Sequence, residues 1–251
     1  TRETQALISA REWYEGCDDY TPAGVFAALV THDTGYVNGI WGDKTPSYLS
    51  HMELLKQIFP SARFIHIVRD VRDYCLSSRQ AWGKSMLRAA QLWSDHVSHA
   101  LLAGNALQDD CIVIRYEDLV AQPETQLRAV CDFLGLEFNS VMTKPDKSAE
   151  NLGDAKGVQR ILPENTEKYR TRMDETMQGR IEAMAGSCLR ELGYPVAHQG
   201  PPKRLSRAQL SACRLYDAVS LLRFEIRNRG LLEALRLRWK LYAVSGNRLR
   251  S

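Results

Sequence analysis

Residues 63–78 read Arg63-Phe64-Ile65-His66-Ile67-Val68-Arg69-Asp70-Val71-Arg72-Asp73-Tyr74-Cys75-Leu76-Ser77-Ser78. The run from Phe64 to Val68 is short, mostly apolar and β-branched, which is typical of a strand buried on both faces. Asp70 or Asp73 can cap a helix that begins directly after this strand. The stretch therefore predicts a strand that is followed at once by a helix.

A strand that ends where a helix begins can bind an anion, because free N–H groups and the positive end of the helix dipole point to one spot. Arg69 would lie at the strand tip and Ser77 further into the helix, so both side chains can reach one anion there. The pattern predicts a phosphate site. The alternative is a charged strand–helix corner that contains an Arg–Asp pair and binds no ligand, because short motifs have many false positives.

The composition is that of a soluble globular protein. The 251 residues suffice for one domain, or for one domain with an appendage. No apolar run is long enough to span a bilayer and the N-terminus does not resemble a signal peptide, so we expect a cytoplasmic protein. The six Cys are scattered without metal-binding spacing, which favours buried free thiols in a reducing compartment and no metal site.

The charge is unevenly distributed along the chain. Residues 201–251 hold twelve Lys and Arg against three Asp and Glu, a formal charge of +9, whereas the rest of the chain carries −6. Residues 205–243 have helical periodicity, with apolar positions among many Arg. We expect an amphipathic helix that packs on the body or on a second subunit, or a basic helix that lies on an anionic membrane. Nucleic acid is not expected, because no nucleic-acid-binding motif accompanies the charge.

Lys44 stands just before a predicted helix that is opened by Thr45-Pro46 and ended by Phe59-Pro60. A cation gains nothing from the helix dipole at that position, and an anionic ligand would explain it. Taken alone, Asp43-Lys44 can equally be a solvated surface pair.

The remaining pattern alternates strands and helices. We expect an α/β fold with a mostly parallel sheet flanked by helices, formed by residues 1–198, and a basic helical C-terminal extension formed by residues 199–251. The predicted elements are a helix over 84–104, a buried strand over 112–116, a helix over 123–134, a long polar loop over 139–168 and a helix over 173–192.

Several of these segments resemble sulfotransferases that use PAPS (3′-phosphoadenylyl sulfate). Arg69 and Ser77 match the spacing of that family's 3′-phosphate-binding element, and Lys44-Thr45-Pro46 is similar to a segment that precedes it in the family. Arg115–Leu119 and Leu192-Gly193-Tyr194 are similar to further family segments. The resemblance implies a P-loop nucleotide-kinase-like fold, with Arg69 and Ser77 on the 3′-phosphate of PAPS and Lys44 near the transferred sulfuryl group.

The resemblance also implies roles for other residues. In the family, the region of the polar loop closes over the nucleotide, which makes the loop's basic residues candidate contacts: Lys156, Arg160, Lys168 and Arg170. Arg2-Glu3-Thr4 resembles a family segment whose acidic residue serves as the base, so Glu3 is the candidate base, with Asp43 or His51 as weaker substitutes. His66 is expected to be a core residue.

One family signature is not found in this sequence. The family's phosphosulfate-binding loop is a strand followed by a Pro-Arg-Ser-Gly-Thr-Thr-like sequence, and nothing here matches it. Residues 82–85 (Trp-Gly-Lys-Ser) are similar to the end of a P-loop, but Ser78 stands where the first Gly of a P-loop should be and a predicted helix precedes them. We therefore expect the chain to begin downstream of that loop.

These observations predict an enzyme that transfers a sulfuryl group from PAPS to a hydroxyl of a small-molecule, sugar or glycolipid acceptor, releasing adenosine 3′,5′-bisphosphate. Two alternatives remain open. The first is a protein that binds the nucleotide without catalysis, and the second is a membrane-associated scaffold that uses the Arg-rich C-terminal helix.

Overall fold

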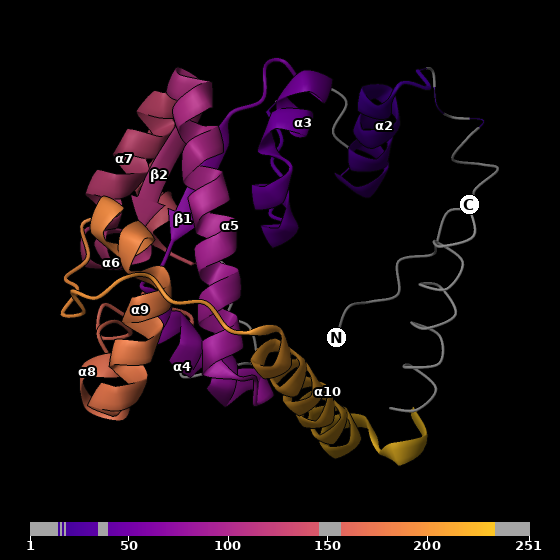
Figure 1. Ribbon diagram of the computed structural model, residues 1–251. Coiled ribbons are helices and arrows are strands. Elements are labelled where there is room, and N and C mark those ends of the chain that lie inside the picture. Colours follow the sequence, from indigo (N-terminus) through magenta and orange to yellow (C-terminus); the bar gives the residue numbers. More distant parts are fainter. Residues whose placement is uncertain (1–14, 16, 18, 35–39, 146–156, 234–251) are drawn as a thin grey trace.

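The computed structural model describes residues 15, 17, 19–34, 40–145 and 157–233 (Figure 1). Most of this part of the chain is helical, and η denotes a 3-10 helix. The elements are, in order, α2 (Pro22–Thr34), η1 (Pro46–Ser50), α3 (Met52–Ile58), β1 (Phe64–Val68), α4 (Val71–Trp82), α5 (Met86–Leu107), η2 (Gln108–Asp110), β2 (Cys111–Arg115), α6 (Tyr116–Ala121), α7 (Pro123–Leu134), η3 (Ser140–Thr143), α8 (Tyr169–Arg172), α9 (Glu175–Glu191) and α10 (Arg207–Arg229).

The two described strands form a parallel sheet. Their register runs from Phe64 opposite Cys111 to Val68 opposite Arg115, and the chain crosses from β1 to β2 through α4 and α5. Parallel strands end at the same edge of a sheet, so the residues that follow them, Arg69 and Tyr116, meet at that edge. The parallel strands among helices confirm the predicted α/β fold class.

The expectation that β1 is buried on both faces is wrong for the described part of the chain. His66 and Val68 are buried, whereas Ile65 is 39% and Ile67 54% exposed. The burial alternates because successive side chains point to opposite faces of a strand, and along β1 only the face that carries His66 and Val68 is buried. His66 lies in the core, as expected, and burial lowers its pKa.

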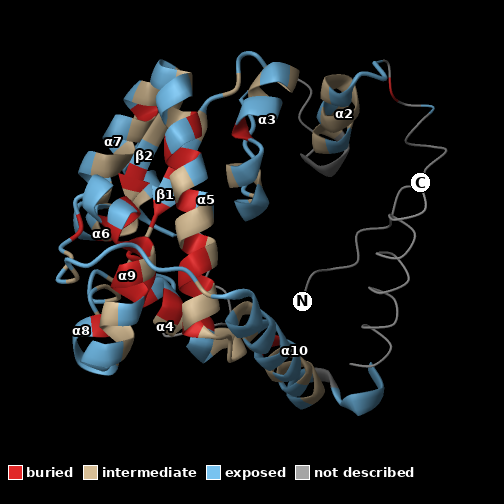
Figure 2. Ribbon diagram, in the orientation of Figure 1, coloured by how far each residue is buried: buried red, intermediate tan, exposed pale blue. Residues whose placement is uncertain are grey.

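The main core lies between α4, α5 and α9. It joins apolar side chains of the three helices to the end of β1, with Cys75, Trp93, Ile181 and Leu189 among its buried members (Figure 2). Each of these helices presents one apolar stripe at helical spacing to the others. This core fixes the start of α4, which carries the candidate anion site.

The connection between α4 and α5 differs from the predicted helix over 84–104. Gly83 adopts φ = 68°, a left-handed conformation that ends α4, and the Ser85 side chain accepts the Arg88 N–H at the start of α5. Residues 82–85 therefore form a helix–helix corner and not a phosphate-binding loop after a strand. The predicted helix over 45–59 is also divided, into η1 and α3, which meet at His51.

Two C-terminal predictions hold in part: η3 lies inside the loop expected over 139–168, and the helix expected over 205–243 is present as α10, which ends at Gly230. Residues 157–168 form turns and bends without a regular element, in the region where a polar loop was expected. α10 begins with a capping box between Ser206 and Gln209, and extends away from the body beside α4 and α5 (Figure 1). Among the described helices, none is long and apolar enough to cross a membrane.

Candidate functional site

The candidate site is built where β1 ends and α4 begins. Asp70 caps α4, because its side chain accepts the Arg72 N–H at 2.8 Å. Arg69 is the residue before this cap, and Ser77 lies on α4. The Arg69 Nη1 and Ser77 Oγ atoms are 3.5 Å apart, so the structure brings the two predicted phosphate ligands together.

The Arg69 guanidinium is held by three further groups. Its Nη2 donates to the Asn165 carbonyl at 2.6 Å, its plane lies over the Tyr116 ring at 4.6 Å, and Asp73 Oδ2 lies 3.9 Å from Nη2. Asn165 also donates from its side chain to the Tyr116 hydroxyl at 3.0 Å. The side chain of Arg69 is 21% exposed, so the cation is oriented by the protein and still reachable from solvent.

Lys168 joins the same cluster. Its Nζ donates to the Asn165 side-chain oxygen at 2.6 Å, so Asn165 connects Lys168 to Arg69. We call the group of Arg69, Ser77, Tyr116, Asn165 and Lys168 the anion corner. Two cations and a hydroxyl that lie together are groups that bind a phosphate monoester, so the residues present fit such a group.

Asp73 is the acidic neighbour of the anion corner. It is fully buried, and its Oδ1 accepts the Tyr169 N–H at 2.9 Å. Burial raises the pKa of Asp73 above its usual value, while the Tyr169 N–H and the charges of Arg69 and Lys168 act in the opposite direction. The carboxylate therefore partly balances Arg69 before any ligand binds.

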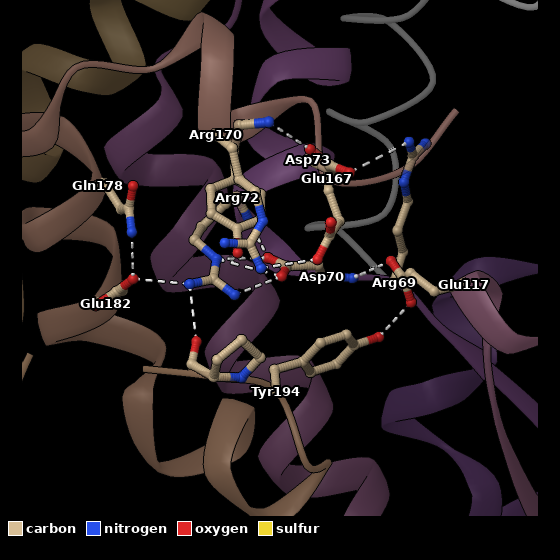
Figure 3. A network of polar contacts seen from close by, with 12 residues as sticks. Arg69, Asp70, Arg72, Asp73, Glu117, Glu167, Arg170, Gln178, Glu182 and Tyr194 are labelled. Carbon is tan, nitrogen blue, oxygen red and sulfur yellow. Dashed lines mark hydrogen bonds and ion pairs between the residues drawn. The ribbon is translucent and has the colours of Figure 1, made fainter. Parts of the chain in front are cut away.

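A buried ion network lies behind the anion corner, and Figure 3 shows it around Arg72. Arg72 binds Asp70 at 2.6 Å and Glu182 at 2.7 Å, and its guanidinium plane lies over the Tyr169 ring at 4.0 Å. Burial alone would lower the pKa of Arg72, but the two carboxylates hold it above its usual value. Glu182 also accepts the N–H groups of Ala197 and His198, so α9 and the chain after it are tied to the start of α4.

Glu117, in α6 directly after β2, supports the same end of β1. One of its oxygens accepts the Asp70 N–H at 3.0 Å, and the other accepts the Tyr194 hydroxyl at 2.6 Å. Burial and this bond raise the pKa of Tyr194. Glu117 therefore makes polar contacts at the ends of the two strands.

The other predicted site residues lie elsewhere. Lys44 and His51 are exposed beside η1 and α3, and Asp43 accepts the Thr45 hydroxyl at 2.7 Å. Within the described ranges, no hydrogen bond or ion pair links Lys44 to the anion corner. Glu3 and Lys156 lie outside the described residues.

Two basic residues of the loop region face acidic neighbours. Arg170 is exposed and binds Glu167 at 2.8 Å, and Arg160 approaches Glu164 at 3.4 Å.

Sequence reasoning missed Asn165 and Glu182, because each acts through a partner about a hundred positions away. Arg72 and Asp73 follow shortly after an apolar stretch, and buried charged residues are almost always paired. This pair could therefore have indicated a buried ion network.

The described part of the chain contains no group of three His, Cys, Asp or Glu side chains that could hold a metal ion. A depression of about 380 Å³ lies between α9 and residues 198–209 and is lined by none of the residues of the anion corner.

Fold and site together define an α/β protein with a cationic corner at the carboxyl edge of a parallel sheet. A sequence profile described as "Sulfotransferase family" matches residues 4–140, more than half of the chain. The chain belongs to the sulfotransferase family.

Known proteins agree with this membership. Protein-tyrosine sulfotransferase 1 of Danio rerio is 28% identical over 221 residues, which cover 80% of this chain and 60% of the relative. The chain thus spans about 60% of the length of this curated relative.

Two solved structures share the fold. The sulfotransferase domain from the Synechococcus PCC 7002 olefin synthase has a TM-score of 0.56 at 25% identity, over 69% of this chain and 64% of that one. The sulfotransferase domain from the curacin biosynthetic pathway has a TM-score of 0.51 at 20% identity, over 69% of this chain and 68% of that one.

Proposed function

We propose that this chain transfers a sulfuryl group from PAPS to an acceptor hydroxyl. The observation that carries the proposal is the anion corner, in which Arg69 and Ser77 converge at 3.5 Å beside the end of β1. A guanidinium and a hydroxyl at this place can hold a phosphate on the ribose of a nucleotide, and family membership supports PAPS as that nucleotide.

The remaining roles are those that the resemblance to the family implies, and they agree with the chemistry of group transfer. PAPS supplies the sulfuryl group when it is bound. Arg69, Ser77 and Lys168 hold the 3′-phosphate and thereby align the donor. Lys44 stabilises negative charge near the leaving oxygen, and Glu3 removes the proton of the acceptor hydroxyl.

The acceptor class is a hydroxyl compound. Small molecules, sugars and glycolipids are the proposed acceptors, and the relative named for protein tyrosine adds a peptide tyrosine hydroxyl to the set that should be tested. A panel that holds one member of each class, assayed with labelled PAPS, identifies the acceptor by which member receives the label.

The first test measures nucleotide binding to the anion corner. Arg69→Ala should weaken the binding of adenosine 3′,5′-bisphosphate by about 1.5–3 kcal/mol, the range of hydrogen bonds to charged groups. Isothermal calorimetry should therefore give a Kd that is about ten- to a hundredfold higher than for the unmodified chain.

Two controls make this test specific. Arg79→Ala removes an exposed arginine from the same helix and should leave the Kd unchanged. Adenosine 5′-monophosphate lacks the 3′-phosphate, so Arg69→Ala should not change its affinity. An Arg69→Ala chain that binds the bisphosphate as tightly as the unmodified chain would refute the assignment.

A second candidate function is nucleotide binding without transfer. It is favoured by one observation: of the two strands that the structure describes, neither leads into a glycine-rich loop, because β1 runs into Arg69-Asp70 and β2 into α6. Turnover of labelled PAPS separates the two functions. Tight binding of the bisphosphate with no label transferred to any acceptor of the panel would favour the binder.

A further inference from the structure

The outward face of α10 carries an apolar stripe that is exposed at Leu215 and Val219 and half-buried at Leu222 and Ile226. α10 turns by about 100° per residue, so Leu215, Val219, Leu222 and Ile226 fall on one line along the helix. Leu215 is 68% exposed and Val219 is 40% exposed, and the neighbouring Tyr216 is 53% exposed. Figure 2 shows that α10 is exposed along most of its length.

The contacts of α10 show that the stripe faces away from the body. Asp217, which is buried, accepts the Ser85 N–H at 2.7 Å and binds Arg88 at 2.7 Å. The Ser85 hydroxyl contacts Cys213 at 3.3 Å. Asp217 and Cys213 occupy one side of α10, and the helical period places Leu215 and Val219 on the opposite side.

Arginines flank the stripe on both sides. The helical period puts Arg207 and Arg214 along one border and Arg223 and Arg227 along the other, and all four are exposed. Long cationic side chains beside an apolar stripe can bury their stems at an apolar surface and keep their charged ends in the polar layer above it. This is the arrangement of a helix that lies in the plane of a membrane interface.

The charge selects an anionic lipid surface over a second copy of the chain. α10 contains five Arg and two acidic residues, and one of the two, Asp217, is already bound to Arg88. Two copies that met through this stripe would bring their arginine borders together, which is repulsive. Residues 234–251 add five Lys and Arg and no acidic residue to the sequence, so the positive charge continues beyond α10.

We infer that α10 binds the surface of an anionic membrane through the Leu215–Val219 face, with its arginine borders on the lipid headgroups. α10 does not cross the bilayer, because no described helix is long and apolar enough to do so. The body remains attached to α10 through Asp217, so this contact holds the anion corner near a membrane. The inference does not depend on the proposed transferase activity.

Vesicle co-sedimentation of the full chain tests the inference. The chain should sediment with vesicles of phosphatidylcholine and phosphatidylglycerol, and much less with phosphatidylcholine alone. Leu215→Ser combined with Val219→Ser should weaken this partitioning at least about tenfold, because several buried methylene groups are lost. Arg214→Gln combined with Arg223→Gln should weaken the partitioning by about fivefold for each charge removed. High salt should also weaken the partitioning, because it screens the charges.

Matched controls come from the body. Leu102→Ser removes an equally exposed leucine from α5, and Arg128→Gln removes an exposed arginine from α7. Both should leave partitioning unchanged. Circular dichroism and the Kd for adenosine 3′,5′-bisphosphate should be the same for all variants, because each change lies on the surface outside the anion corner.

Three outcomes would overturn the inference. The first is that the chain does not sediment with anionic vesicles, and the second is that the α10 variants sediment as well as the unmodified chain. The third is a concentration-dependent dimer that the combination of Leu215→Ser and Val219→Ser abolishes. The last outcome, measured by analytical ultracentrifugation, would assign the stripe to a second copy of the chain.

Discussion

Asp73 sets the charge that a ligand meets at the anion corner. Its carboxylate lies 3.9 Å from the cation that is proposed to bind phosphate, and its burial favours the protonated form. A carboxyl group whose pKa is raised in the folded state binds its proton more tightly there than in the unfolded chain. Its contribution to stability is therefore present at low pH and is lost as the pH rises from 3.8 through the raised pKa.

Asp73→Asn should strengthen nucleotide binding. Asn keeps an oxygen for the Tyr169 N–H but removes a negative charge that competes with the phosphate, so the Kd for adenosine 3′,5′-bisphosphate at pH 7 should fall about three- to tenfold. Calorimetry at neutral and mildly acidic pH measures this, and the affinity of the variant should depend less on pH. Asp132→Asn, an exposed change on α7, is the control. A Kd equal to or higher than that of the unmodified chain would contradict the expectation.

At the scale of elements, Glu182 ties α9 to the start of α4. Burial alone would raise its pKa, but bonds from Gln178, from the His198 N–H and from Arg72 lower it below the usual 4.5. A carboxylate of this kind stabilises the fold above its unfolded pKa, and the contribution is lost as the pH falls through the folded value.

Glu182→Gln should destabilise the fold by about 3 kcal/mol at pH 7, because the buried Arg72 loses one of its two carboxylates. The loss of stability below the usual pKa of 4.5 should become shallower than in the unmodified chain. Urea unfolding followed by circular dichroism across this pH range measures both effects. Glu191→Gln changes an exposed residue on the same helix and should neither destabilise the fold nor change how its stability depends on pH.

Asp217 joins α10 to the start of α5. Asp217→Ala removes the acceptor of the Ser85 N–H and leaves Arg88 without this carboxylate, so it should lower the free energy of unfolding by about 1.5–3 kcal/mol. Asp217→Asn keeps an acceptor for the Ser85 N–H and should lose less. Equal stability of Asp217→Ala and the unmodified chain in urea would show that α10 is not held at this point.

At the scale of the whole molecule, the sequence predicted correctly those features that depend on residues close together in the chain. Phe64–Val68 gave a strand because of its β-branched run, and Asp70 began α4 because a carboxylate can accept the free N–H groups of a first turn. The spacing of Arg69 and Ser77 predicted that they face each other, since both lie within one strand–helix unit.

Long-range partners could not be predicted from one sequence. Arg72 meets Glu182, and Ser85 meets Asp217, across more than a hundred residues, and nothing in the local pattern selects these pairs. The burial of a strand is a similar case, because the apolar run of β1 does not show which of its faces a helix will cover. The sequence left both packing and membrane contact as possible roles of α10 for a related reason. Apolar residues lie on both sides of this helix, and only its contacts in the structure show which side is covered.

The attachment of α10 at Asp217 has a mechanical consequence. The contacts that Cys213, Asp217 and Ser220 make with the body lie in the first two-thirds of α10, and Gly230 ends the helix away from them. A load applied to the C-terminal end of α10 would therefore reach the start of α5 through Asp217 and Cys213, which contact Ser85 and Arg88 there. The strength of this small set of polar contacts, and not the core, would then set how far the body can be pulled before α10 separates from it.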